Sequence, residues 1–323
     1  MLNDADGRTI RYLRLSLTES CQMRCTYCRP DWLTNTPHHD TLQPDEIHWL
    51  VSHLVQRHGL RKVRLTGGDP TARADLLEII RRIASIPGIE DLAMTTNGLT
   101  LAHRAHDYAA AGLRRVNVSL DSLDPQRFTR LTGVDAMERV IRGIDTARQA
   151  GLGPVKINTV VVRHNNEDEL VDLARFAAER STEIRFIELM PMGPLAEQWA
   201  DRYVTAAEMR RNLEQHFTGW EPIDQGSDSA TRYAVTDPRG NHSTVGFITP
   251  MSCNFCDACN RIRITSRAQL YPCLMDKPAG SLMPAFRDRR DPNLLDDLLA
   301  RGLSHKQPHH PQEGHVVMTH IGG

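Results

Sequence analysis

The seven cysteines are the residues whose spacing most directly indicates chemistry. They fall into two groups, and residues 29–252 between the groups contain no cysteine. The first group is Cys21, Cys25 and Cys28, and the second is Cys253, Cys256, Cys259 and Cys273. Cysteines used only as small apolar core residues would be scattered along the chain. This clustering therefore predicts metal ligation.

The first group has the spacing C-x3-C-x2-C. Three thiolates at this spacing can hold three irons of a 4Fe–4S cluster and leave the fourth iron open to a small chelating ligand. A structural zinc site usually closes with four ligands, and no further residue stands at a zinc-finger spacing from Cys28. We therefore predict an open iron–sulfur cluster here, rather than zinc or an unliganded loop.

The second group again supplies three ligands, at the spacing C-x2-C-x13-C, from Cys256, Cys259 and Cys273. Arg261 and Arg263 alternate on an extended run just after the second of them, so both side chains should project to one face beside the metal. Arginine suits phosphate oxygens, which favours a second open cluster next to a phosphate-bearing ligand. A closed zinc site completed by Cys253 is the alternative, as is a solvated basic face.

Alternating strands and helices must position these groups. Strands are predicted over residues 11–17, 63–66, 91–95, 115–120, 155–162 and 183–188. Helices are predicted over residues 44–58, 74–84, 101–111, 136–150 and 168–180. This α/β alternation is typical of parallel strands with crossover helices, and it is compatible with a doubly wound sheet or an incomplete barrel. In either architecture the reactive residues belong at the carboxyl ends of the strands.

The composition excludes several classes of protein. Apolar residues make up 40% of the chain and charged residues 24%, and the net charge is −1. These values suit a packed core and argue against a surface devoted to nucleic acid. No run approaches the roughly 20 apolar residues of a membrane span, and the acidic start lacks the layout of a signal peptide. We expect a cytoplasmic protein that uses neither nucleic acid nor membrane as a partner.

Residues 21–28, CQMRCTYC, resemble the cysteine signature of the radical S-adenosylmethionine superfamily, including the aromatic residue before the third cysteine. Residues 66–70, TGGDP, are similar to the glycine-rich motif of that superfamily, which grips the methionine amine. The superfamily usually has Glu where this chain has Asp69, which is one methylene shorter. Without the cysteines, residues 66–70 would be an ordinary strand-to-helix turn.

Further motifs resemble the GTP 3',8-cyclase family of molybdenum cofactor biosynthesis. They are CNRIR at residues 259–263, TTNG at 95–98, RVNVSLDS at 115–122, IRFIE at 184–188 and the terminal Gly-Gly. The resemblance runs from about residue 11 to 323 and is least clear over 220–245 and 277–315. It implies an incomplete (βα)6 TIM-type barrel over residues 1–220. Residues 221–323 would form a smaller C-terminal domain that binds the second cluster.

The resemblance also implies the activity. The enzyme would use two 4Fe–4S clusters and S-adenosylmethionine to convert GTP to 3',8-cyclo-7,8-dihydro-GTP. This is the first step of molybdenum cofactor biosynthesis. A 5'-deoxyadenosyl radical would remove the hydrogen from C3' of the ribose, which makes the enzyme a radical lyase. A flavodoxin or ferredoxin system would supply the electron, and cyclic pyranopterin monophosphate synthase would take the product. The oligomeric state stays open, with a homodimer as one candidate.

Particular residues match the family's binding positions. Those implied to contact S-adenosylmethionine are Tyr27, Gly68, Asp69, Ser119 and Met190. Those implied to bind the nucleotide are Arg14, Arg64, Thr95, Lys156, Arg261 and Arg263. Arg185 joins them because a charge within a strand is costly unless it has a partner, although a salt bridge would satisfy it equally. The tail residues Gly322 and Gly323 would reach into the site and assist the radical step, whereas a frayed terminus is the ordinary alternative.

Two rival functions remain at this point. The first is a radical enzyme that modifies a peptide and uses the second cluster as an electron relay, although such enzymes often carry more C-terminal cysteines. The second is a zinc-stabilised binding protein without catalysis, which would be colourless and contain zinc.

Overall fold

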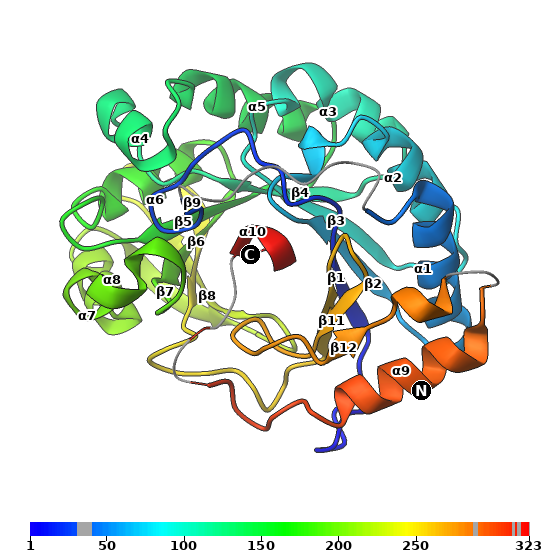
Figure 1. The fold of residues 1–323 in the computed structure, drawn as a ribbon. Coiled ribbons are helices and arrows are strands. Elements are labelled where there is room, and N and C mark those ends of the chain that lie inside the picture. The colour runs from blue at the N-terminus through cyan, green and yellow to red at the C-terminus, as the bar shows by residue number, and fades with distance from the viewer. Residues whose placement is uncertain (31–40, 287–289, 312–313, 315–317, 323) are drawn as a thin grey trace.

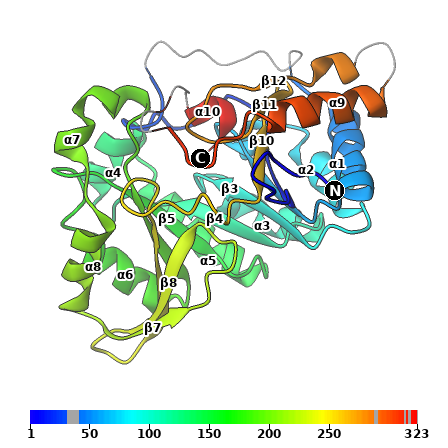
Figure 2. The same cartoon turned by 90° about the horizontal axis from the view of Figure 1, so that it is seen from below.

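The computed structural model describes residues 1–30, 41–286, 290–311, 314 and 318–322. The described residues form a 12-stranded sheet curved into an open ring, with helices packed around its outside (Figure 1). A second view places α9, α10, β11 and β12 toward one end of this ring (Figure 2). None of the helices in these ranges is long and apolar enough to cross a membrane.

The strands follow one another along the whole chain. In chain order they are β1 (Tyr12–Ser16), β2 (Lys62–Thr66), β3 (Asp91–Thr96), β4 (Arg115–Ser119), β5 (Lys156–Val161), β6 (Glu183–Glu188), β7 (Thr218–Ile223), β8 (Ala230–Thr236), β9 (His242–Ile248), β10 (Arg261–Ile264), β11 (Gln269–Tyr271) and β12 (Gly280–Ser281).

The helices alternate with the first six strands and then continue through the C-terminal part. They are α1 (Pro44–His58), α2 (Leu76–Ala84), α3 (Leu101–Ala110), α4 (Pro125–Thr132), α5 (Met137–Gln149), α6 (Leu170–Glu179), α7 (Trp199–Arg202), α8 (Ala206–Glu214), α9 (Pro292–Leu303) and α10 (Met318–Ile321). Short 3-10 turns are η2 (Pro70–Ala72), η3 (Gly193–Gln198) and η4 (Met283–Ala285).

The sheet order is β12-β11-β10-β1-β2-β3-β4-β5-β6-β9-β8-β7. Strands β1 to β6 are parallel to their neighbours, as the predicted incomplete (βα)6 barrel requires. β10 pairs in parallel with β1, and β9 pairs in parallel with β6, so the C-terminal half extends both edges of the barrel. The α/β prediction is confirmed, and the division at residue 220, which falls within β7, stays a prediction.

Local sequence signals explain where the elements begin and end. α1 starts with Pro44 at its first turn, followed by Asp45 and Glu46, whose charges suit the helix N-terminus. It ends at Gly59, whose φ of 71° is left-handed and whose N–H bonds back to the carbonyl of Val55. Between these ends the apolar residues keep helical spacing and are buried against the sheet. Buried residues at helical spacing likewise hold the other barrel helices against the sheet.

Candidate active site

One cavity collects the predicted ligands at the carboxyl ends of the parallel strands. Six cysteines line it, which are Cys21, Cys25, Cys28, Cys256, Cys259 and Cys273. Cys253 is exposed and does not belong to the lining. The two cysteine groups, which are far apart in sequence, therefore open into the same space, because β10 pairs directly with β1.

The first three cysteines lie on the loop that leaves β1, and burial controls their acidity. Burial, followed by the neighbouring Cys28, raises the pKa of Cys25 well above its ordinary value. Burial also raises the pKa of Cys28 to about 12. The loop is fixed by Arg29, whose Nη1 donates to the carbonyl oxygen of Cys21 at 3.0 Å. Buried thiols that lose their protons only beside a cation suit a metal cluster better than a free nucleophile.

The glycine-rich turn after β2 packs tightly against this loop. A Cβ on Gly68 would lie 2.3 Å from the carbonyl oxygen of Ser20. Gly67 has a φ of 139°, and a Cβ there would lie 2.3 Å from the carbonyl oxygen of Thr18. Both positions therefore require glycine, which lets the turn approach the cysteine loop and leaves room beside it for a ligand.

Asp69 holds this turn to the end of β3. Its carboxylate accepts hydrogen bonds from the N–H of Thr71 at 2.8 Å and from the hydroxyl of Thr96 at 2.9 Å. It also accepts from the backbone N–H of Asn97 at 2.5 Å. The side chain lines the cavity, but its oxygens already accept from four donor groups, because the hydroxyl of Thr71 also donates to Oδ1. The shorter acid therefore fixes the position of the turn.

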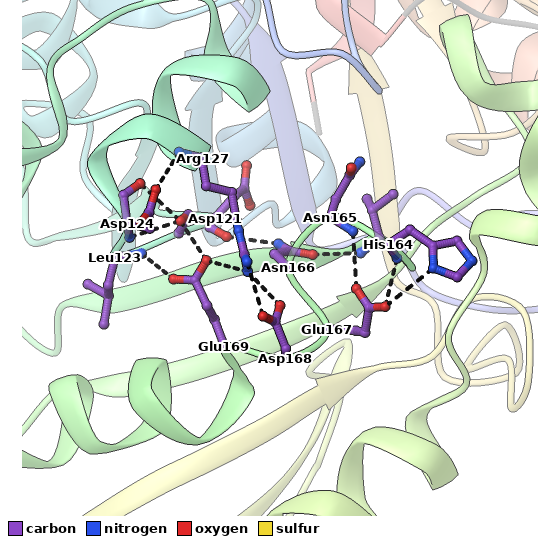
Figure 3. A network of polar contacts seen from close by, with 12 residues as sticks. Asp121, Leu123, Asp124, Arg127, His164, Asn165, Asn166, Glu167, Asp168 and Glu169 are labelled. Carbon is purple, nitrogen blue, oxygen red and sulfur yellow. Dashed lines mark hydrogen bonds and ion pairs between the residues drawn. The ribbon is translucent and has the colours of Figure 1, made fainter.

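Asp121, just after β4, ties the cysteine loop to β5. Its Oδ2 accepts from the hydroxyl of Tyr27 at 2.7 Å, and its Oδ1 accepts from the N–H of Val160 at 2.9 Å. Asn166 donates from Nδ2 to the backbone carbonyls of Asp121 and Val160, and Figure 3 shows it within a larger polar network that includes Glu169. Burial raises the pKa of Asp121 to about 6. Tyr27 is thereby held in place at the cavity wall.

The second cysteine group is surrounded by positive charge. Arg261 and Arg263 both line the cavity from β10, on the same face as their alternation predicts. The ammonium of Lys306 donates to the carbonyls of Pro272 at 2.6 Å and Arg261 at 3.1 Å, and it lies 3.6 Å from the Sγ of Cys259. Although burial raises the pKa of Cys259, these cations outweigh burial and lower it to about 7. A thiolate ligand therefore forms readily at neutral pH.

Four strand residues present buried polar atoms to the cavity. They are Arg14 on β1, Arg64 on β2, Asn117 on β4 and Asn158 on β5. Among the residues that the structure describes, the arginine Nε atoms and the asparagine Oδ1 atoms have no hydrogen-bond partner. Burial lowers the pKa of Arg64 to about 10. Buried polar groups are nearly always paired, so this wall fits a polar, anionic ligand.

Lys156 and Arg185 instead meet acidic partners inside the protein. Arg185 donates through both Nη atoms to the carboxylate of Asp228, at 3.0 and 2.7 Å, and it also pairs with Glu183. The Nζ of Lys156 lies 3.4 Å from Glu183 and 3.7 Å from Asp228. Arg185 lines the cavity, whereas Lys156 does not. The salt-bridge alternative therefore holds for this pair in the structure.

The end of the chain reaches the same cavity. Met318 of α10 lines it, and the Nη1 of Arg263 donates to the backbone carbonyl of Gly322. A Cβ on Gly322 would lie 2.3 Å from the Oγ1 of Thr66, at the start of the glycine-rich turn. The tail is therefore packed between the second cysteine group and the turn. Gly323 lies outside the described residues.

The remaining expected residues, Thr95, Ser119 and Met190, also line the cavity. Three lining asparagines, Asn97, Asn117 and Asn158, were not predicted as site residues. Asn117 could have been found because it alternates with Ser119 and so faces the same side of β4. Asn158 occupies the neighbouring position on β5, opposite Ser119. Lys306 had no signal at all in the sequence, because it follows α9 in a segment without a motif.

The described residues hold one compact group of metal-ligating side chains, and it lies away from the cavity. A zinc ion holds cysteine sulfurs at about 2.3 Å, which brings the sulfurs within about 4 Å of one another. In the described part of the chain, the only three or more candidate ligand atoms within 4.8 Å of one another belong to His53, His58 and Asp296, outside the cavity. Neither cysteine trio draws its three sulfurs this close together in the structure.

Comparison with known proteins agrees with this geometry. The family model described as Radical SAM superfamily matches residues 15–177, and the model described as Molybdenum Cofactor Synthesis C matches residues 182–312. Two solved structures of Streptococcus suis SuiB share the fold. The form bound to S-adenosylmethionine has a TM-score of 0.63 and 14% identity, covering 92% of this chain and 68% of that one. The form bound to precursor peptide SuiA has a TM-score of 0.58 and 15% identity, covering 95% and 75%.

The partial barrel and the cysteine loop at its mouth define the class as radical S-adenosylmethionine proteins. Curated relatives then specify the family. A GTP 3',8-cyclase of Pelotomaculum thermopropionicum is 40% identical over 329 aligned positions, covering 100% of both chains. Those of Rhizobium etli and Listeria monocytogenes are 38% and 36% identical, covering 95% and 96% of this chain and 87% and 92% of theirs. The chain belongs to the GTP 3',8-cyclase family.

Proposed function

We propose that this protein is a GTP 3',8-cyclase that converts GTP to 3',8-cyclo-7,8-dihydro-GTP, the first committed step toward molybdenum cofactor. Family membership over the full chain supports the activity. The single structural observation that carries the proposal is the shared cavity, into which both cysteine trios and the arginines of β1, β2 and β10 open. A reaction that joins a radical source to an anionic nucleotide needs both in one enclosed space.

Each cysteine trio would hold one 4Fe–4S cluster. Three sulfurs that line a cavity suit a cluster whose fourth iron would bind a small ligand. When bound, the first cluster would supply the electron that splits S-adenosylmethionine and yields the 5'-deoxyadenosyl radical. The chain would hold S-adenosylmethionine and GTP in the correct relative positions and exclude water from them.

The S-adenosylmethionine position is supported by the residues around the first cysteine loop. Gly68 can approach a ligand closely because it has no Cβ, and Tyr27 is fixed by Asp121. Ser119, the last residue of β4, and Met190, which follows β6, also line the cavity. Asp69 would act on the cosubstrate by holding the glycine-rich turn, since its oxygens accept from Thr71, Thr96 and Asn97.

The GTP position is supported by the positive charge of four arginines that line the cavity. Arg14, Arg64, Arg261 and Arg263 all line the cavity, and β10 and β1 place Arg263 directly beside Arg14. A triphosphate would relieve this concentration of buried positive charge. Thr95 also lines the cavity, and Arg185 with Lys156 would reach the phosphates by exchanging their acidic partners.

The finer properties follow from the same proposal. The enzyme would be a lyase that takes its electron from a flavodoxin or ferredoxin system in the cytoplasm and passes its product to cyclic pyranopterin monophosphate synthase. Gly322 and Gly323 would assist the radical step from the tail. Neither rival function is favoured, because the relatives are cyclases and the family models cover both halves of the chain.

An anaerobic reaction followed by mass spectrometry tests the proposal. Cluster-loaded protein would be mixed with S-adenosylmethionine, a reductant and GTP, and GTP would be omitted in the control. We expect 5'-deoxyadenosine together with a GTP-derived isomer of unchanged mass. Equal 5'-deoxyadenosine without GTP, with the nucleotide untouched, would leave the radical chemistry and remove GTP as the substrate.

A further inference from the structure

A stripe of side chains on α1 faces the segment that leads into α9. Asp45, Trp49, His53 and Arg57 recur every four residues, so they lie along one face of the helix. Asp45 pairs with Arg290, and the ring of Trp49 meets that of Phe286 edge-on at 5.1 Å. Figures 1 and 2 both draw α9 alongside α1. These side chains therefore hold α1 against the segment that precedes α9.

At the end of this stripe, three metal-binding side chains converge. The Nε2 of His53 and the Nε2 of His58 each lie 2.6 Å from the same oxygen, Oδ1 of Asp296. The rings of the two histidines are 5.5 Å apart and inclined at 65°. The three side chains are 8%, 12% and 19% exposed, so the cluster is sheltered and still open to solvent. None of the three lines the active-site cavity.

The geometry suits a metal ion with small adjustment. Two imidazole nitrogens and one carboxylate oxygen are the ligands of open tetrahedral zinc sites, which take a water as the fourth ligand. Zinc bound at about 2.0–2.1 Å separates its ligand atoms by about 3.3 Å. Opening the 2.6 Å contacts to that separation needs a shift of less than about 1 Å, which small side-chain rotations supply.

We propose that His53, His58 and Asp296 form a further metal site, independent of both cysteine groups, that binds one zinc-class divalent ion and joins α9 to α1. The site lies on residues that take no part in the proposed cyclase chemistry. Lys306 follows three residues after the end of α9 and contacts Cys259 and Pro272. Fixing α9 would therefore also steady the residues around the second cysteine group.

Arg57 would compete with a metal ion for the carboxylate of Asp296. Its Nε lies 2.5 Å from the other oxygen of Asp296, Oδ2, and its side chain is 57% exposed. A guanidinium here neutralises Asp296 and repels an incoming cation, so it competes with the metal. Arg57→Gln should tighten zinc binding several-fold, whereas loss of either histidine or of the carboxylate should abolish it.

The test uses cluster-loaded protein dialysed anaerobically against buffered free zinc, with zinc and iron measured by elemental analysis. We expect about one zinc per chain with no loss of iron, and essentially none in the His53→Ala/His58→Ala variant. Asp296→Asn, which keeps both rings, should also lose the zinc and covers the case in which the double variant folds poorly. The matched control is His103→Ala/His106→Ala, which removes two exposed helical histidines from α3.

X-ray absorption at the zinc edge identifies the ligands directly. The proposal predicts nitrogen and oxygen neighbours at about 2.0–2.1 Å and no sulfur at about 2.3 Å. A sulfur shell, or zinc that displaces iron, would assign the metal to the cysteines and overturn the proposal. Equal zinc in the wild type and in both site variants would overturn it as well. Cyclase activity enters none of these readouts, so failure here leaves the proposed function untouched.

Discussion

The guanidinium of Arg263 donates a hydrogen bond from Nη1 to the backbone carbonyl oxygen of Gly322. Arg263 lies on β10, four residues after Cys259, whereas Gly322 is the last residue that the structure describes. The contact brings the C-terminal tail into the cavity that both cysteine groups share. Gly322 is therefore packed against the residues that line this cavity.

Replacing Gly322 by Ala should abolish cyclisation while both clusters stay loaded. The residue has a φ of 70°, and its Cβ would lie 2.3 Å from Thr66 Oγ1 and 2.7 Å from the N of Gly67. The tail must therefore leave its position, since backbone cannot yield cheaply there. Product formation and iron content measure the two effects separately. Gly151→Ala is the matched control, because it has a φ of 76° and open space around it; normal activity of the Gly322 variant would remove the tail from the site.

Replacing Lys306 by Met should lower the reduction potential of the second cluster. The ammonium lies 3.6 Å from Cys259 Sγ, and positive charge favours the more negative reduced state. A unit charge at about 4 Å is worth about 1–4 kcal/mol, which is on the order of 40–170 mV for one electron. A redox titration followed by electron paramagnetic resonance measures the shift. Lys277→Met, at an exposed position, should change nothing, and an unshifted potential in the Lys306 variant would contradict the assigned contact.

Asp228→Asn should increase the affinity for GTP by about five- to tenfold. Although burial raises the pKa of Asp228, Arg185 outweighs it and holds that pKa far below its ordinary value. The carboxylate therefore competes with a triphosphate for Arg185 and Lys156. GTP binding by calorimetry measures the gain, and Asp224→Asn, exposed on the same loop, is the control. Weaker or unchanged binding would show that these cations do not meet the phosphates.

Lys156 predicts a pH dependence of GTP binding. Burial, followed by Arg185, lowers the pKa of Lys156 to about 8. In the unfolded chain a lysine keeps its proton up to about pH 10.4, so this group's contribution to folding stability rises with pH between these two values. GTP affinity should move in the opposite direction and fall above about pH 8, because the ammonium charge is lost. Lys156→Arg should flatten this fall, and an equally steep fall in that variant would assign it to another group.

The barrel was predictable because its signals are local. Every predicted strand and helix up to residue 188 lies within two residues of the observed element, since periodicity, Pro44 and Gly59 act within a few residues of their position. α4 was missed because it is a short helix beginning at Pro125. The cysteine spacing likewise indicated the clusters, because ligands to one metal group lie close together in the chain.

The rest depended on contacts between distant parts of the chain. No local pattern could show that β10 pairs with β1 and brings Arg263 beside Arg14. The same is true of two other contacts. Lys306, which follows α9, lies beside Cys259, and Asp228, on the loop before β8, neutralises Arg185. Asp69 shows the limit within a motif. Its contact with the cosubstrate stays a prediction, and no local pattern showed that its oxygens also accept from the turn and from β3.

The most direct test of the cyclase account follows one hydrogen atom. GTP carrying deuterium at C3' of the ribose would be incubated anaerobically with the cluster-loaded protein, S-adenosylmethionine and a reductant, and the 5'-deoxyadenosine would be analysed by mass spectrometry. The account predicts that the deuterium moves into 5'-deoxyadenosine while the nucleotide product loses it. Unlabelled 5'-deoxyadenosine, with the deuterium retained on the nucleotide, would contradict the proposed reaction at its first step.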